Sequence, residues 1–271
     1  MNLENLFRLD NQKSFVVGAA GGIGRESALA LAGHGSHVVC ADLNEDGAEE
    51  TKQLIVEQGG SAEAVVLDVL NADEVTAAAN QHEDTHTLVF TAAINVRKPL
   101  LEYTAEEYEK VHRLNQLATF RLIQSFGRNM VTRREGSIIG FSSIRHTVVE
   151  PGQGVYAATK AATVQLLRTA AAEFGPFGVR ANAIAPGVVE TALTAQIKRE
   201  PEWYEAYAQK SALKRWSMPN ELAGPVVFLA SEAASFVTGT VLYADGGWTA
   251  VDGRFDPPLA GWSSTPHQQG D

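Results

Sequence analysis

The stretch Gly18-Ala19-Ala20-Gly21-Gly22-Ile23-Gly24 joins two patterns of hydrophobicity. Residues 14–17 before it form a short apolar run, and residues suited to a helix follow it as far as Leu31. Glycine lets the backbone approach an anion closely, and the N-terminus of the following helix offers free N–H groups and a positive dipole end. A plain glycine turn is the alternative, but the position at the first strand–helix junction favours a cradle for a dinucleotide.

Short apolar runs recur along the chain, separated by segments of helix length. Their hydrophobicity is continuous rather than alternating, which is typical of parallel strands buried on both faces. We therefore predict an α/β fold, a Rossmann-type doubly wound parallel sheet of about seven strands flanked by helices. The expected strands are residues 14–17, 37–41, 63–67, 87–91, 137–141, 180–184 and 240–243.

Two long helices and one irregular region are expected. Thr104-Ala105-Glu106-Glu107 has the spacing of a capping box in front of an amphipathic run at 108–130, and Gly154–Phe174 is rich in alanine. Between residues 188 and 218 the pattern weakens and turns aromatic and charged, which suggests a mobile substrate flap. We expect one domain at 1–251 and, where the composition becomes rich in proline and polar residues, an arm or tail at 252–271.

Composition narrows the class of protein. The 271 residues are 45% hydrophobic, enough for a sizeable core, and the net charge of -10 disfavours nucleic acid as a partner. The only cysteine, Cys40, lies in an apolar run, so we expect a buried thiol and a reducing compartment. The N-terminus lacks the order of a secretory signal and no stretch approaches a membrane span, so we expect a cytoplasmic protein with no membrane partner.

Acidic residues follow the second and third expected strands. Asp42, followed by Leu43, ends the second strand, where its carboxylate can accept hydrogen bonds from both ribose hydroxyls and would repel a 2′-phosphate. NAD is therefore expected rather than NADP. The alternative is that Asp42 caps the next helix. Asp68 and Val69, after the third strand, are expected to hold the adenine.

Tyr156 and Lys160 lie at positions i and i+4 of an expected helix, on the same face. A nearby cation stabilises a phenolate and lowers the pKa of the tyrosine from about 10, so that it can exchange a proton with a substrate hydroxyl. Such a pair alone is also common on ordinary helix surfaces. Here Ser143 ends a buried strand nearby, and Asn115 lies in an apolar helix stretch, where a water molecule linking it to Lys160 would satisfy its amide.

Three further motifs occur later in the chain, namely Asn182-Ala183-Ile184-Ala185-Pro186-Gly187, Thr191 and Asp245-Gly246-Gly247. Together with the features above, they make the chain resemble the short-chain dehydrogenase/reductase family from about Lys13 to Val251. The resemblance implies a catalytic tetrad of Asn115, Ser143, Tyr156 and Lys160. It implies that Pro186, Gly187 and Val189 border the nicotinamide and that Thr191 reaches its carboxamide. It also implies that Tyr156 and Lys160 contact the cofactor and that a homotetramer is built partly on the two long helices.

The sequence departs from the family pattern around the glycine loop. Val17 replaces a threonine, Gly21 replaces a serine, and Phe90-Thr91-Ala92-Ala93 replaces Asn-Asn-Ala-Gly. Ala92 and Ala93 still place small side chains beside the cofactor. We expect the loop to lose the side-chain hydrogen bonds that brace it.

Polar residues are expected around the nicotinamide, and the predicted substrate-binding residues are Asn95, Arg97, Ser143, Arg145, Gln153 and Tyr156. This lining suits a sugar, a sugar derivative or a polyol, whose hydroxyl would be oxidised with NAD. Arg97 and Arg145 could also bind an acidic group, as in a sugar acid or sulfosugar, or else pair with surface carboxylates. The alternatives are a 3-ketoacyl or apolar ketone reductase and, more remotely, a catalytically silent dinucleotide-binding scaffold.

His82-Glu83-Asp84-Thr85-His86 matches the zinc-protease pattern His-Glu-x-x-His. That chemistry needs both histidines on one helix face and a third ligand. The segment leads directly into an expected strand, and Asp84 and Thr85 are poor helix residues. We therefore predict a polar turn and no metal.

Overall fold

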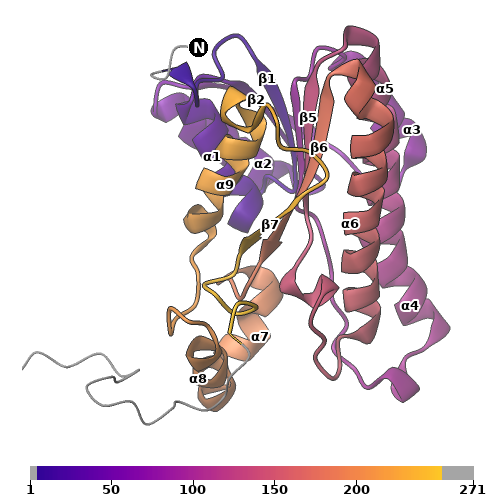
Figure 1. Ribbon diagram of the computed structural model, residues 1–271, viewed down its shortest axis with the longest axis vertical. Coiled ribbons are helices and arrows are strands. Elements are labelled where there is room, and N and C mark those ends of the chain that lie inside the picture. Colours follow the sequence, from indigo (N-terminus) through magenta and orange to yellow (C-terminus); the bar gives the residue numbers. More distant parts are fainter. Residues whose placement is uncertain (1–4, 252–271) are drawn as a thin grey trace, which may run out of the picture.

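The computed structural model describes residues 5–251, so the predicted arm at 252–271 lies outside the described residues. Seven strands form one sheet with helices on both faces (Figure 1). The strands are β1 (Lys13–Val17), β2 (His37–Asp42), β3 (Ser61–Val66), β4 (Thr87–Phe90), β5 (Gly136–Phe141), β6 (Val179–Pro186) and β7 (Val241–Ala244). The helices are α1 (Gly22–Gly33), α2 (Glu45–Glu57), α3 (Ala72–Gln81), α4 (Ala105–His112), α5 (Ala118–Arg133), α6 (Gly154–Phe174), α7 (Ala195–Lys198), α8 (Pro201–Lys210) and α9 (Ala223–Ala230).

All neighbouring strands pair in parallel, in the order β3-β2-β1-β4-β5-β6-β7. The predicted doubly wound sheet is therefore confirmed, and each strand begins and ends within two residues of its expected position. The strand order reverses between β1 and β4. At such a point the connections leave toward opposite faces, and a crevice opens at the carboxyl ends of the strands.

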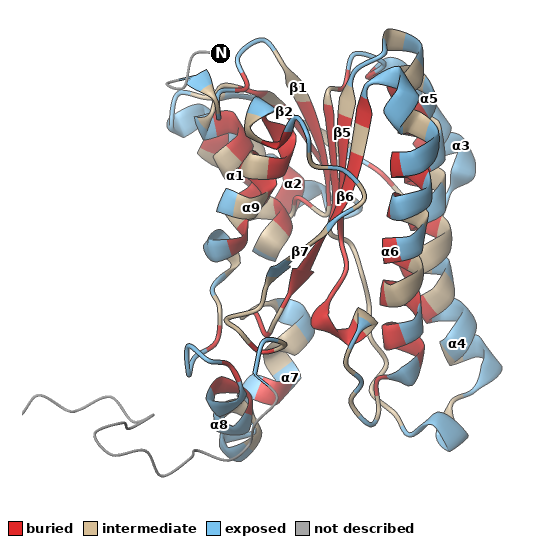
Figure 2. Cartoon of the chain, viewed as in Figure 1, coloured by how far each residue is buried: buried red, intermediate tan, exposed pale blue. Residues whose placement is uncertain are grey.

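The core has one apolar layer on each face of the sheet. Phe15, Leu88 and Ile138 pack with side chains of α3, α5 and α6, whereas Val16 and Val38 pack with side chains of α1, α2 and α9. Figure 2 shows the result, with buried strands and helices that are buried where they face the sheet and exposed outside. Adjacent strand residues point to opposite layers, which explains why the strands read as continuous apolar runs.

The helix predicted at 108–130 begins earlier and is interrupted. Thr104 caps α4 in the expected capping box with Glu107. At Arg113–Leu117 the backbone forms a π-helical turn before α5 continues. A π-helical turn adds a residue between hydrogen-bonded groups, and such turns often occur at functional sites. Asn115 lies in this turn and is buried.

The predicted flap is not a featureless loop. It contains α7 and α8, and its aromatic residues pack with Trp248 in a third apolar cluster that includes Trp216 and Tyr207. The rings of Tyr204 and Trp216 stack with centroids 4.7 Å apart. In Figure 1 this segment lies beyond the carboxyl ends of the strands, where the crevice opens.

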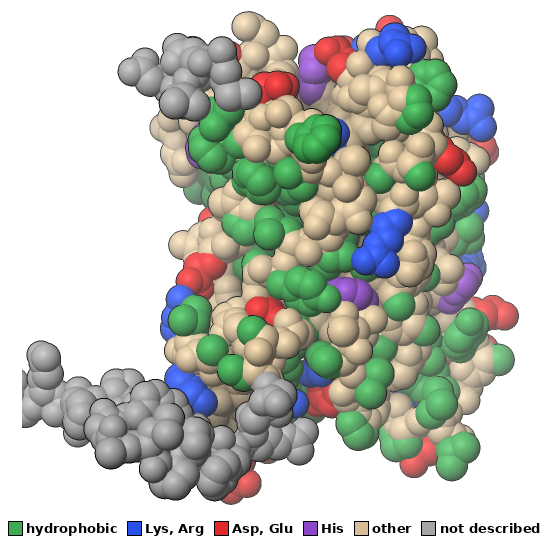
Figure 3. All heavy atoms as spheres, in the orientation of Figure 1, with side chains coloured by type: hydrophobic (Ala, Val, Ile, Leu, Met, Phe, Trp, Pro, Cys, Tyr) green, Lys and Arg blue, Asp and Glu red, His purple; other side chains and the backbone are tan. Residues whose placement is uncertain are grey.

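Two further findings concern the surface and the helices. On the face drawn in Figure 3, acidic and basic side chains are scattered singly among apolar and uncharged ones. Among the described residues, no helix combines the length and the apolar character that crossing a membrane requires.

Candidate active site

The glycine loop between β1 and α1 is shaped for close backbone contacts. Gly18 and Gly22 have left-handed φ values of +89° and +53°. A Cβ atom on Gly24 would lie 1.9 Å from the carbonyl oxygen of Gly18. Gly21 precedes the first turn of α1, which has no side-chain cap and no acidic residue. The N–H groups and the dipole of α1 are therefore available to an anion, and the loop fits the pyrophosphate of a dinucleotide.

Side chains from three elements brace the loop, so the expectation that it loses its braces is wrong. The Thr91 hydroxyl, after β4, donates to the Val17 carbonyl at 3.1 Å, and the Thr51 hydroxyl of α2 donates to Ala19 at 2.7 Å. The guanidinium of Arg25 donates to the Ala20 carbonyl at 2.7 Å. The Thr91 hydroxyl, together with Thr51 and Arg25 from outside the motif, thus replaces the hydroxyl and amide groups of the family pattern.

Asp42 lies at the end of β2 and does not cap the next helix, because the N-cap of α2 is Asn44. Its two carboxylate oxygens accept hydrogen bonds from the backbone N–H groups of Ala20 and Asn44, each at 3.0 Å. A carboxylate can accept about four hydrogen bonds, so each oxygen retains capacity for a ribose hydroxyl. Leu43 is exposed beside it.

The other expected adenine contacts follow β3 at the same end of the sheet. Val69 is buried, and the Asp68 carboxylate accepts a hydrogen bond from the Leu70 N–H group at 2.8 Å. Ala92 lies against the glycine loop, where a Cβ atom on Gly18 would be 3.1 Å from its nitrogen. Ala93 follows it and is half-buried.

Ser143, Tyr156 and Lys160 meet where the end of β5 packs on the first turns of α6. Ser143 and Tyr156 line the same pocket. The ammonium of Lys160 lies 5.6 Å from the centroid of the Tyr156 ring and donates to the Phe141 carbonyl at 2.8 Å. The hydroxyl of Ser142 donates to the Lys160 carbonyl at 2.9 Å. The strand end and the helix are thereby fixed against each other.

Burial and nearby charged groups both act on the Tyr156 phenol. Burial raises the pKa of Tyr156, whereas the Ser143 hydrogen bond and the positive charges of Arg97 and Arg145 lower it. Burial also lowers the pKa of Lys160 to about 8. A pKa of about 8 leaves most Lys160 side chains charged at pH 7, so the expected influence of this cation on the Tyr156 phenol stays a prediction. The charges of the two pocket arginines act on the phenol in the same direction.

Asn115 is buried, but its amide has protein partners rather than needing a water molecule. Its Oδ1 accepts from the Ile94 N–H group at 2.9 Å, and its Nδ2 donates to the Ile94 carbonyl at 2.9 Å and to the Thr159 hydroxyl at 3.1 Å. Thr159 in turn donates to the Tyr156 carbonyl at 2.8 Å. Asn115 thus joins the segment after β4 to the turn of α6 that carries Tyr156.

A pocket opens beside Tyr156 and extends toward the glycine loop. Of the residues expected near the nicotinamide and the substrate, it is lined by Ile23, Asn95, Arg97, Ser143, Arg145, Gln153, Tyr156, Pro186, Gly187, Val189 and Thr191. Thr191 also lies over the loop, since its Cγ2 would be 3.6 Å from a Cβ atom on Gly22. The structure therefore brings the residues expected around the nicotinamide and those expected around the substrate into one pocket.

Behind one wall of the pocket lie contacts that the sequence analysis did not predict. Glu150 accepts a hydrogen bond from Arg145 at 2.5 Å and further hydrogen bonds from Gln153 and from the Tyr207 hydroxyl of α8. Trp203 of α8 lies 5.3 Å from the Arg97 guanidinium. Motif position could not reveal these contacts, because it does not fix side-chain direction; the aromatic content of the flap was the available signal.

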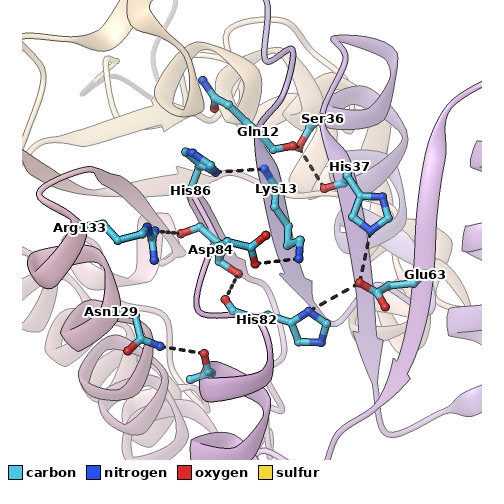
Figure 4. A network of polar contacts seen from close by, with 12 residues as sticks. Gln12, Lys13, Ser36, His37, Glu63, His82, Asp84, His86, Asn129 and Arg133 are labelled. Atoms are coloured by element: carbon cyan, nitrogen blue, oxygen red, sulfur yellow. Dashed lines mark hydrogen bonds and ion pairs between the residues drawn. The ribbon is translucent and has the colours of Figure 1, made fainter.

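The His-Glu-x-x-His segment is a turn, as predicted. Figure 4 shows the two histidines directed to different partners at the amino ends of the strands. His82 ends α3 and its Nδ1 lies 3.6 Å from Glu63, whereas the Nδ1 of His86 accepts from the Lys13 N–H group at 3.2 Å. No cluster of metal-ligating side chains occurs within residues 5–251.

Comparison with known proteins defines the class. A family model described as enoyl-(acyl carrier protein) reductase matches residues 18–249. Galactitol 2-dehydrogenase (L-tagatose-forming) of Cereibacter sphaeroides is 36% identical over 92% of this chain and 99% of the relative. Gluconate 5-dehydrogenase of Gluconobacter oxydans is 32% identical, again over 92% and 99%. The crystal structure of a gluconate 5-dehydrogenase from Burkholderia cenocepacia in complex with NADP and tartrate has a TM-score of 0.88 at 32% identity, covering 91% of this chain and 98% of that chain.

The chain belongs to the short-chain dehydrogenase/reductase family. It is an oxidoreductase that acts on CH–OH groups, with a fold that binds NAD or NADP. The resemblance stated from the sequence is thereby confirmed, as is the prediction of an enzyme rather than a silent scaffold.

Proposed function

We propose that this protein is an NAD-dependent dehydrogenase that oxidises a hydroxyl group of a sugar, a sugar derivative or a polyol. The observation that carries the proposal is the pocket itself. Tyr156 and Ser143 lie in a wall that also presents Asn95, Arg97 and Gln153, and the pocket continues to the glycine loop. A lining rich in hydrogen-bonding groups matches a polyhydroxylated substrate better than an apolar ketone.

In the proposed reaction, Tyr156 accepts the proton of the substrate hydroxyl and Ser143 donates a hydrogen bond to the same oxygen. The bound dinucleotide supplies the hydride acceptor. Lys160 would hold the ribose, and Asn115 keeps the turn of α6 that carries Tyr156 in place through Thr159. Pro186, Gly187, Val189 and Thr191 would border the nicotinamide.

The test is oxidation of a panel of sugars, sugar acids and polyols, followed by the absorbance of the reduced dinucleotide. We expect Tyr156→Phe to lower the rate of hydride transfer by a factor of roughly 100 or more, since the phenol is the proton acceptor, while dinucleotide binding persists. Undiminished turnover by Tyr156→Phe would contradict the assigned role. Faster reduction of apolar or carrier-linked ketones than oxidation of any polyol would favour the 3-ketoacyl or apolar ketone reductase instead.

NAD is proposed over NADP because Asp42 faces the place expected for the ribose. The NADP bound to the Burkholderia cenocepacia relative makes this choice worth testing directly. Fluorescence titration with NADH and NADPH should show tighter binding of NADH. Asp42→Asn should reduce the ratio of the NADPH Kd to the NADH Kd on the order of 10-fold, because it removes a charge that repels the 2′-phosphate. Tighter binding of NADPH by the parent protein would overturn the assignment.

The quaternary structure proposed is a homotetramer. Its support in this chain is an apolar groove between α5 and α6, which includes Phe120, Ile123, Leu166 and Phe174. The domain proposed is residues 1–251, with the segment at 188–218 acting as a substrate flap.

A further inference from the structure

The two arginines of the pocket differ in whether a carboxylate neutralises their positive charge. Arg145 is buried, and its Nη2 forms an ion pair with Glu150 at 2.5 Å. Because Glu150 already neutralises this guanidinium, a second carboxylate beside it would bring two negative charges together. Arg145 is therefore poorly suited to bind an acidic substrate.

Arg97 forms no ion pair with a carboxylate within residues 5–251. Its Nε is buried and finds no hydrogen-bond partner among residues 5–251. The guanidinium carbon lies 5.3 Å from the centre of the Trp203 ring, so the aromatic face supports the group without using its N–H donors. A buried donor without a partner is costly, and a ligand that accepts its hydrogen bond would recover that free energy.

A second unpartnered group lies in the same wall. The Nδ2 of Asn95 donates to the Gln153 side chain at 2.8 Å, and this bond directs the Asn95 amide. Its Oδ1 is buried and has no partner in the described chain. Asn95, Arg97, Ser143 and Tyr156 all line one pocket. The wall thus presents one free donor, one free acceptor and the proposed reaction centre.

We propose that Arg97 and Asn95 form a recognition subsite for a polyhydroxylated carboxylic acid, an aldonate, rather than a neutral sugar or polyol. The Arg97 fork binds the substrate carboxylate, Asn95 Oδ1 accepts a hydrogen bond from a substrate hydroxyl, and Arg145 takes no part in anion binding. The inference rests on the proposed function and names its substrate class. Because Trp203 belongs to α8, the bound anion also connects the substrate with the flap.

The test compares substrates that differ only at the end expected to face Arg97. D-Gluconate and D-glucitol form one such pair, and D-galactonate and galactitol form another. We expect the parent enzyme to prefer the aldonate of a pair. Arg97→Leu should lower kcat/KM for the aldonate on the order of 10- to 100-fold, mostly through KM, and change the alditol value only a few-fold. Asn95→Leu should lower kcat/KM for both the aldonate and the alditol of a pair, because both substrates have the hydroxyl group that Asn95 contacts.

Matched variants separate this role from general effects of charge. Arg199→Leu removes the same charge from an exposed position that follows α7 and should leave the aldonate preference intact. Arg145→Met should also leave the ratio of aldonate to alditol unchanged, whatever it does to overall activity. Loss of the preference in Arg145→Met but not in Arg97→Leu would overturn the assignment, as would an equal loss for both substrates in Arg97→Leu. Far-ultraviolet circular dichroism checks that each variant is folded.

A binding experiment keeps this proposal apart from the proposed function. Calorimetric titration of tartrate, a small hydroxy acid, into the protein with bound NADH should give a Kd that rises at least 10-fold in Arg97→Leu. If the parent oxidises no polyol or sugar acid, the proposed function fails, and this titration still decides the anion subsite. Equal tartrate affinity in the parent and Arg97→Leu would refute the subsite.

Discussion

At the residue scale, the two glycines at positions 21 and 24 of the loop should respond very differently to one added methyl group. In Gly24→Ala the Cβ would lie 1.9 Å from the Gly18 carbonyl oxygen and 2.9 Å from the Thr91 hydroxyl. In Gly21→Ala it would meet no atom within 4 Å, and the backbone there is extended, with φ near -177°. The same substitution thus tests close packing at one site and open space at the other.

We expect Gly24→Ala to lower the free energy of unfolding by about 1–3 kcal/mol, as overpacking commonly does, and to abolish NADH binding. Gly21→Ala should stay within about 0.5 kcal/mol of the parent. Urea denaturation measures the stability and NADH fluorescence measures the binding. Equal stability of the two variants would contradict this account of the loop.

A second prediction at this scale concerns the pH dependence of oxidation. The reaction needs the phenolate of Tyr156, whose pKa is raised by burial and lowered by the charge of Arg97 among other groups. Removing that charge destabilises the phenolate, so the pKa must rise. In Arg97→Gln, kcat/KM for a neutral alditol should therefore reach its plateau at a higher pH than in the parent. An unshifted profile, with Arg199→Gln as the control, would show that Arg97 has no influence on the phenol.

Some contacts of single side chains could be predicted from the sequence, and others could not. The spacing of Tyr156 and Lys160 and the strand end at Ser143, taken together with the family resemblance, predicted that these side chains share one site. The partners of Arg97 and Arg145 were left open, because the direction of a side chain depends on tertiary contacts from Glu150 and α8. The burial that lowers the pKa of Lys160 was not predicted either, because it is a property of the folded protein.

At the element scale, strands were predicted to within two residues because a doubly covered parallel strand has a distinctive apolar run. The π-helical turn at Arg113–Leu117 was not predicted. A single inserted residue barely alters the helical period of hydrophobicity, so only the buried amide of Asn115 hinted at it. The braces of the glycine loop were missed for a related reason. Thr51 and Arg25 lie outside the motif in sequence and reach it only through the packing of α1 and α2.

The turn between α3 and β4 gives the prediction at this scale. His82 is buried against Phe15, and its Nε2 has no partner in the described residues. Figure 4 shows its other nitrogen directed to Glu63. Burial lowers the pKa of His82 despite the opposing attraction of this carboxylate. The unfolded chain therefore binds the proton more readily than the folded chain, so folding stability falls as pH drops below the ordinary histidine value of about 6.5.

We expect His82→Leu to reduce this loss of stability between pH 7 and pH 5. Urea denaturation at a series of pH values gives the free energy of unfolding of each protein as a function of pH. The difference between the two proteins above pH 7 gives the effect of the substitution that does not depend on proton binding. A parent and a variant with parallel curves throughout would show that His82 does not titrate with folding.

At the scale of the whole molecule, the fold class followed from the glycine loop and the repeating apolar runs, and the family followed from the later motifs that begin at Asn182 and Asp245. The third apolar cluster could not be predicted from the sequence. Trp248 lies far along the chain from Tyr207, yet the two rings pack with centroids 5.5 Å apart, and sequence order gives no sign of that contact. The substrate wall depends on this cluster, which explains why the reaction class was easier to infer than the substrate.

The proposed tetramer gives the last prediction. Phe120 on α5 is 43% exposed beside the groove that α5 and α6 form, and a monomer would leave this apolar face in water. We expect the parent to elute with the mass of four chains in size-exclusion chromatography with light scattering. Phe120→Asp should lower that mass, since a carboxylate buried in the helix interface would lack a partner. Leu101→Asp, at a fully exposed position that does not line this groove, should leave the assembly intact. A monomeric parent, or a Phe120→Asp variant with unchanged mass, would exclude these helices as the interface.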